Sequence, residues 1–281
     1  MSNAPLFKTS LRPGAKGQEV EDVFNYLHAY GYFPNPGLRR VYGGYKPAVE
    51  RRPLNVQVFD ERLEQALAAF QKQHGLEVTG EFDRSTKALF ARPRCGTPDR
   101  NFDRKTLYNP AGYKWGFTVV SCGMKSTARP LLPGFTPAQW KGLLTLAYTE
   151  WSHASKLKLI HYVGDLPGTA ENIYISSHGS GPTCPYPLRP SPDPTLAHAL
   201  QRWNARGMRL TKSNVHFNKY RTWSTNGSAI DLPTVLLHEL GHAIGLDHSS
   251  DASAVMYAYY SGSRRGLMPD DIKGIRSIYG R

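Results

Sequence analysis

Apolar residues in the first third of the chain recur at helical spacing, three or four positions apart. The pattern covers residues 18–30, 60–74 and 83–90, and it puts the apolar side chains of each segment on one face. Residues 31–53 are rich in glycine and proline and predict a long loop between the first two helices. This part of the sequence therefore predicts a small all-helical module.

The rest of the chain alternates between strand and helix character. Residues 114–121, 156–163 and 172–176 predict strands. Three helices are also expected, and each has a proline in its first turn: Pro137, Pro233 and Pro269. This order predicts a twisted, mostly parallel sheet backed by helices, with a smaller subdomain near the C-terminus.

Length and composition fit a globular protein of two domains. The chain has 281 residues, of which 40% are hydrophobic and 11% aromatic, so each domain can bury its own core. We expect an α+β protein in which the helical module precedes the domain with the sheet. The expected division is a tail at 1–14, the module at 15–92, a linker at 93–106 and the second domain at 107–281.

The net charge of +13 predicts contacts with acidic partners, such as an acidic polysaccharide. The basic residues are scattered and no basic motif with interleaved aromatics is present, so no nucleic-acid partner is expected. No run of 18 or more apolar residues occurs, so no membrane span is expected. The first eight residues lack the apolar core of a secretory signal peptide.

An eleven-residue run with three histidines predicts a catalytic zinc site. His238 and His242 are four positions apart, so on a helix they share one face and can bind the same ion. Gly245 permits a left-handed turn that brings His248 round as the third nitrogen ligand. Three protein ligands leave one position of tetrahedral zinc open for water, as in catalytic sites. Glu239 follows the first ligand and is the predicted general base.

The pattern His-Glu-x-x-His-x-x-Gly-x-x-His resembles the signature of the metzincin metalloproteases, and Met256 matches their Met-turn. Within that group the chain resembles the matrixins, or matrix metalloproteinases. Residues 93–99 resemble their cysteine-switch motif, 196–199 their substrate-lining edge strand and 270–280 their closing helix. Residues 70–83 resemble the peptidoglycan-binding-like fold that matrixins use as a propeptide. The resemblance implies that the second domain has the metzincin fold.

The resemblance implies a latent zinc endopeptidase that acts as a monomer on protein substrates outside the cell. Cys95 would bind the zinc as a thiolate and keep the enzyme inactive until the propeptide is cleaved. Arg94 and Asp99 would form a salt bridge that fixes this loop, and the dibasic stretch at 103–105 offers a cleavage point. Substrate would add as an antiparallel strand along residues 196–199.

The matrixin resemblance also implies a second, structural zinc, and here the sequence departs from the family. His178, His198 and His216 match three of its expected ligands. Ser180 stands where the family usually has an aspartate, so Cys184 or a water would have to complete the shell. A second zinc at these three histidines therefore stays an open alternative.

Two further regions depart from the matrixin pattern. The family's acidic calcium ligands appear here as Asn218 and Arg221, so a weakened or absent calcium site is expected. The segment at 258–260, which lines the main specificity pocket in the family, lacks the usual proline.

The three cysteines are an odd number, which predicts one free thiol and allows one disulfide. Cys95 is the free one if it serves as the switch. Cys122 and Cys184 then remain as a pair, whose distance the sequence does not give.

A binding protein is the alternative to an enzyme. In that hypothesis the N-terminal module and the basic charge hold a cell wall or a polysaccharide, and the histidine-rich helix has no catalytic role. The complete set of three histidines together with Glu239 argues against it, because a binder has no need for them. A catalytic domain that acts on a non-peptide amide is a third hypothesis.

Overall fold

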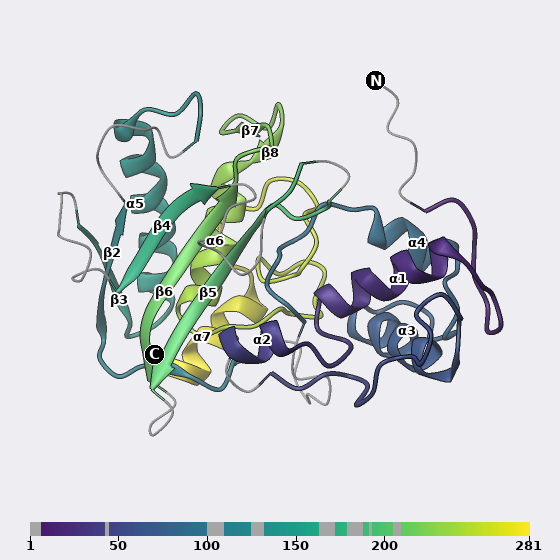
Figure 1. Ribbon diagram of the computed structural model, residues 1–281. Coiled ribbons are helices and arrows are strands. Elements are labelled where there is room, and N and C mark those ends of the chain that lie inside the picture. The colour runs from purple at the N-terminus through teal and green to yellow at the C-terminus, as the bar shows by residue number, and fades with distance from the viewer. Residues whose placement is uncertain are drawn as a thin grey trace.

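The computed structural model describes residues 7–42, 45–99, 110–124, 132–162, 172–178, 188–190, 193–204 and 209–281. A helical module formed by the first part of the chain lies beside a domain built on a sheet, as Figure 1 shows. Each part has its own hydrophobic core. The architecture is therefore α+β, with helices first and the sheet after them, as predicted.

The helical module contains one helix more than the sequence predicted. Its helices are α1 (Gln18–Ala29), α2 (Pro36–Val41), α3 (Glu61–Gln73) and α4 (Arg84–Phe90). The prediction that residues 31–53 form a loop is wrong for residues 36–41, which form α2. This helix begins after Asn35, whose side chain accepts hydrogen bonds from the amides of Gly37 and Leu38. Leu38 is buried and packs in a small cluster with Leu200 of the second domain, which fixes this short helix in place.

The described end of the N-terminal tail packs on the module. Phe7 is buried, and its ring contacts those of Phe82 and Phe90 at centroid distances of 5.1 and 5.5 Å. Leu11 forms a β-bridge with Phe82. The tail thus adds to the core of the module from residue 7 onward.

The sheet of the second domain has strands of both directions. Its strands are β1 (Lys114–Trp115), β2 (Val119–Met124), β3 (Lys158–Tyr162), β4 (Ile173–His178), β5 (Ala197–Asn204) and β6 (Arg209–Asn218). The order β1-β6-β4-β2-β3 is parallel throughout. Strand β5 pairs antiparallel with the other side of β6 and forms an edge of the sheet. Strands β7 (Trp223–Ser224) and β8 (Ile230–Asp231) form a separate short pair.

Two strand predictions need correction. The single strand expected at 114–121 is two strands, because β1 pairs with β6 whereas β2 pairs with β3 and β4. Strand β6 was not predicted at all, although it is the strand that joins β1, β4 and β5. Its first half, Arg209-Leu210-Thr211-Lys212-Ser213, carries little apolar character, and the half-exposed face of the sheet tolerates these polar residues.

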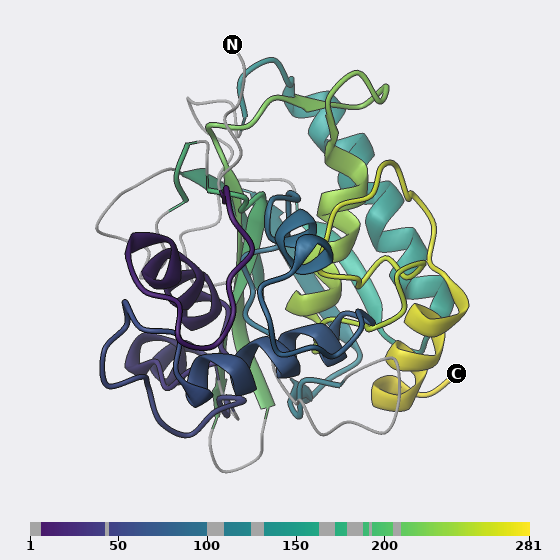
Figure 2. The same cartoon turned by 90° about the vertical axis from the view of Figure 1, so that its right-hand side faces the viewer.

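Helices α5 (Pro137–Ala154) and α6 (Leu232–Ala243) lie on one face of the sheet (Figure 2), and α7 (Pro269–Tyr279) closes the chain. Each has its predicted proline in the first turn, as the first residue of α5 and α7 and the second residue of α6. Every residue of α6 is buried, and the indole of Trp151 in α5 donates a hydrogen bond to the carbonyl of Leu237. This burial holds α6 rigidly beneath the sheet. Among the described helices, none has the length and apolar composition that crossing a membrane requires.

Candidate metal centre and substrate cleft

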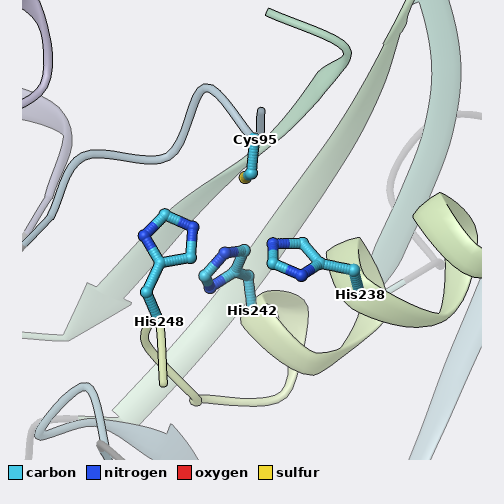
Figure 3. A group of neighbouring side chains, drawn as sticks. All are labelled: Cys95, His238, His242 and His248. Carbon is cyan, nitrogen blue, oxygen red and sulfur yellow. The ribbon is translucent and has the colours of Figure 1, made fainter. Parts of the chain in front are cut away.

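Three imidazoles converge at the end of α6 (Figure 3). His238 and His242 come from successive turns of the helix, and His248 comes from the loop that follows it. One ligand atom from each imidazole and the sulfur of Cys95 all lie within 4.8 Å of one another. The structure thus brings together the four residues that the sequence singled out for the catalytic zinc.

The turn after α6 requires glycine at position 245. Gly245 has φ +105°, and a Cβ at this position would lie 2.5 Å from the carbonyl oxygen of Tyr113. A side chain would therefore clash and be strained at the same time. The turn reverses the direction of the chain, so that the side chain of His248 points back towards α6 (Figure 3).

Each imidazole of the site is oriented through its Nδ1 atom. His238 Nδ1 donates to the carbonyl of Val255 and His242 Nδ1 to that of Leu246, both at 2.7 Å. His248 Nδ1 lies 2.9 Å from Oδ1 of Asp99. These acceptors favour the tautomer that leaves Nε2 of each ring free of a proton and able to bind a metal.

Burial also favours the uncharged imidazoles that metals need. It lowers the pKa of His238 to about 3 and that of His248 to about 4. Nε2 of His238 is buried and has no hydrogen-bond partner within the described part of the chain. A buried nitrogen lone pair of this kind fits a divalent cation such as Zn²⁺.

Met256 packs directly under the helix that carries the first two imidazoles. A Cβ at Gly241 would lie 2.3 Å from the sulfur of Met256 and 2.9 Å from the ring of Trp151, so only glycine fits there. The amides of Val255 and Met256 donate hydrogen bonds to the carboxylate of Asp271 in α7, at 2.9 and 3.0 Å. The segment that carries Met256 is thus held from the C-terminal helix, an anchor that sequence reasoning missed.

Glu239 is fully buried beside the imidazoles and next to the thiol of Cys95. Burial raises the pKa of Glu239 to about 8, while the neighbouring Cys95 thiol acts in the opposite direction. Burial, together with the nearby Glu239 carboxylate, also raises the pKa of the Cys95 thiol well above its usual range. A bound metal cation would lower both pKa values, because its positive charge favours the thiolate of Cys95 and the carboxylate of Glu239.

The segment that carries Cys95 lies between residues 195–197 and residue 258, and its backbone forms hydrogen bonds with both sides. On one side, the amide of Gly96 donates to the carbonyl of Ala197 at 2.7 Å, and Arg94 pairs in parallel with Thr195. On the other, the amide of Cys95 donates to the carbonyl of Ala258 at 2.9 Å. The segment at 93–99 therefore uses backbone groups of the edge strand that the sequence assigned to substrate.

The predicted salt bridge between Arg94 and Asp99 is confirmed. Nη2 of Arg94 lies 2.9 Å from Oδ1 of Asp99, and both side chains are completely buried. Three tyrosine rings surround the guanidinium, with their centroids 3.8 Å (Tyr30), 4.9 Å (Tyr259) and 6.0 Å (Tyr26) from its central carbon. Sequence reasoning missed this aromatic enclosure, because Tyr26 lies in α1, Tyr30 directly follows that helix and Tyr259 comes more than 200 residues later.

A pocket opens beside the metal ligands. It is lined by α6 and by the segment after Met256, including Tyr257, Ala258, Tyr259 and Tyr260. Residues 258–260 thus form a wall of the pocket, where the sequence placed them. Arg264 also lines the pocket, and its guanidinium donates to the carbonyl of Ala254 at 2.9 Å, so it is tied into the wall.

A second cluster of imidazoles lies at the ends of three neighbouring strands. His178 of β4, His198 of β5 and His216 of β6 each offer a ligand atom within 4.8 Å of the others. Burial lowers the pKa of His216 to about 3, which keeps it uncharged. The three predicted histidines are thus together, whereas Ser180 and Cys184 lie outside the described residues.

Asn218 and Arg221, which stand where matrixins have acidic calcium ligands, act as hydrogen-bond donors. Nδ2 of Asn218 donates to the carbonyls of Arg189 and Thr195, at 2.8 and 2.9 Å. Nε of Arg221 donates to the same carbonyl of Thr195 at 3.3 Å. A calcium ion would compete with these donors for the same carbonyl oxygens. This is a structural reason to expect weak or no calcium binding here, which stays a prediction.

Cys122 is a free thiol in the core of the sheet domain. Burial raises its pKa to about 12, so it stays protonated and unreactive. This argues against the disulfide with Cys184 that the cysteine count allowed, although Cys184 itself lies outside the described residues.

The arrangement of three imidazoles, a neighbouring buried glutamate and an edge strand beside them defines a metallopeptidase of the metzincin class. The family model "Matrixin" matches residues 114–280, and "Putative peptidoglycan binding domain" matches residues 16–89. The chain is 29% identical to "Metalloendoproteinase 1" of Glycine max over 97% of its length and 85% of that protein. It is 30% identical to "Metalloendoproteinase 1-MMP" of Arabidopsis thaliana, over 95% of this chain and 70% of the relative.

A human relative is also similar, over a shorter stretch. The "Neutrophil collagenase" of Homo sapiens is 33% identical over 76% of this chain and 43% of its own length. The chain belongs to the matrixin family, and it is a zinc metalloendopeptidase.

Proposed function

We propose that the protein is made as a latent endopeptidase whose zinc is held by His238, His242 and His248. Cys95 supplies the fourth ligand until the leader is removed, where the leader is the chain from its start to the proposed cleavage stretch at 103–105 and so includes Cys95 and Asp99. The observation that carries this proposal is the convergence of the cysteine sulfur and three imidazoles within 4.8 Å. The leader brings the sulfur to this point from a different part of the fold.

Glu239 is the proposed general base. When bound, Zn²⁺ polarises the scissile carbonyl and lowers the pKa of a water ligand towards neutrality. The carboxylate of Glu239 accepts the proton of the attacking water and passes it to the nitrogen of the leaving amine. Its position supports this role, because it directly follows His238 on the buried helix α6 and lies beside the imidazoles that would hold the metal.

The substrate is proposed to be an extended stretch of protein that pairs with the edge strand near Ala197. The leader also bonds there through its backbone, in the parallel direction and not in the antiparallel one expected of substrate, and this use of the edge supports strand addition. A substrate side chain next to the scissile bond would enter the pocket between α6 and residues 257–260. Leader and substrate therefore exclude each other.

Latency follows from the same contacts. A thiolate at the metal leaves no open position for water, and the leader also fills the cleft. Cleavage in the linker would remove the thiolate from the metal and the leader from the cleft at the same time. The proposed cleavage stretch, residues 103–105, lies outside the described residues.

A second zinc at His178, His198 and His216 is supported by their convergence, and no calcium is proposed near Arg221. We propose that the enzyme works outside the cell as a monomer, in keeping with its family. Its positive charge suits an acidic polysaccharide in the surroundings.

The binding alternative has the match of residues 16–89 to a putative peptidoglycan binding domain in its favour. In the fold, however, this module contacts the switch segment: Tyr30 stacks on Arg94, and Tyr32 donates to Asp99. Holding the leader on the cleft is therefore the role that the contacts favour.

Limited proteolysis with an activity readout tests the proposal. We expect the intact chain to leave a quenched peptide library uncut and the trimmed chain to cleave it. A zinc chelator should abolish this cleavage, and added Zn²⁺ should restore it. Trimmed protein that contains stoichiometric zinc yet cleaves no peptide, or cleavage that resists the chelator, would contradict the proposal.

A further inference from the structure

The three imidazoles of the catalytic site differ in where their Nδ1 acceptors come from. His238 and His242 donate to backbone carbonyls of the catalytic domain itself, at Val255 and Leu246. His248 is hydrogen bonded to a carboxylate, Asp99, which belongs to the leader. Removal of the leader therefore takes away the orienting partner of one imidazole and leaves those of the other two.

Asp99 is held for this contact by groups from several elements. Its Oδ1 lies 2.9 Å from both Nη2 of Arg94 and Nδ1 of His248. Its Oδ2 accepts from the hydroxyl of Tyr32 at 2.8 Å and lies 3.2 Å from Nε2 of His74. The carboxylate is completely buried, and its backbone amide donates to the carbonyl of Tyr30, so its position is fixed on every side.

A carboxylate is a stronger acceptor than a carbonyl for the N–H of a metal-binding imidazole. It fixes the orientation of the ring and increases the electron density on the opposite nitrogen. Loss of such an outer partner weakens metal binding by about 10- to 100-fold in known sites. Asp99 has the position, the burial and the charge for this role.

We propose that Asp99 is a positioning residue for the catalytic zinc, present only while the leader is docked. It gives the latent chain a tighter zinc site than the trimmed enzyme has, independently of the thiolate of Cys95. The leader thus secures the metal before activation as well as blocking the cleft. This inference rests on the proposed function, since it takes His248 to be a zinc ligand.

Thermodynamic linkage makes the effect reciprocal. If Asp99 strengthens the binding of zinc to His248, zinc must strengthen the docking of the leader by the same factor. A metal-free chain should therefore expose its leader to proteases more readily than a metal-loaded one, even when position 95 has no thiol.

The test measures zinc affinity in untrimmed chains that carry Cys95→Ser, so that the thiolate plays no part. We expect Asp99→Asn in this background to weaken zinc binding by about 10- to 100-fold in competition with a chromophoric chelator. Tyr32→Phe is the matched control, because it removes one bond to Asp99 and leaves the contact with His248; its effect should stay below about threefold. Equal affinities of the Asp99→Asn chain and its parent would overturn the inference.

Two further measurements separate the causes of a changed affinity. His248→Ala should abolish tight zinc binding; if it does not, the proposed function fails rather than the role of Asp99. In case Asp99→Asn simply frees the leader, the imidazole NMR spectrum of the zinc-loaded latent chain gives an answer without that variant. In the Cys95→Ser background, where no thiolate leaves the metal, the Nδ1 proton of His248 should shift on trimming by more than those of His238 and His242, and an unchanged His248 proton would overturn the inference.

Discussion

Replacing Cys95 by serine should make the untrimmed chain an active peptidase. A serine hydroxyl is a far poorer zinc ligand than a thiolate, so the fourth position opens to water. The leader remains held by the Arg94–Asp99 pair and by the backbone bonds of Gly96 to the edge strand. We therefore expect activity at least about tenfold above that of the intact wild-type chain, yet below that of trimmed enzyme, because a docked leader still competes with substrate.

The rate of cleavage of a quenched peptide, per zinc bound, measures this effect, and mass spectrometry verifies that the leader is intact. Cys122→Ser is the matched control, since it makes the same change at the buried free thiol in the sheet core. That chain should remain latent. An untrimmed Cys95→Ser chain as silent as wild type would show that the cysteine is not what holds the enzyme inactive.

Glu239→Gln should abolish peptidase activity in the trimmed enzyme and leave its zinc in place. Glutamine has nearly the same shape, but it cannot accept the proton of the attacking water or return it to the leaving amine. General acid–base catalysis of this kind is worth about 10²- to 10⁴-fold, and a loss of kcat/KM within or above this range is expected. Steady-state kinetics together with metal analysis measures both quantities.

Glu150→Gln provides the control for this substitution. Glu150 lies on α5 and accepts a hydrogen bond from the amide of Leu267, which a glutamine can also do. Its activity should stay within about threefold of wild type. If Glu239→Gln retained more than a tenth of the activity, another group would have to be the base.

The metal ligands were predictable because they are close together in the sequence. The spacing of His238 and His242 fixes their common face once the segment is helical, and Gly245 signals the turn that returns the chain. Local rules of helix geometry suffice for all three ligands. The same holds for the prolines in the first turns of α5, α6 and α7.

Contacts between distant segments lay beyond such rules. The carboxylate of Asp99 meets His248 across 149 positions, and the ring of Tyr259 reaches Arg94 across 165. Strand β6 escaped prediction because its polar residues are tolerated on an open face of the sheet, and α2 because a short capped turn looks like loop. In each case tertiary packing determines the local structure or the contact, and the local pattern of a single sequence does not reveal that packing.

The central claim is that a zinc ion bound by His238, His242 and His248 exchanges a cysteine ligand for an open position when the leader is removed. X-ray absorption at the zinc edge, recorded on the same sample before and after trimming, tests it most directly. The account predicts nitrogen at about 2.0–2.1 Å in both states, with one sulfur at about 2.3 Å only before trimming. A spectrum without sulfur in the latent chain, or the same shell in both states, would contradict it.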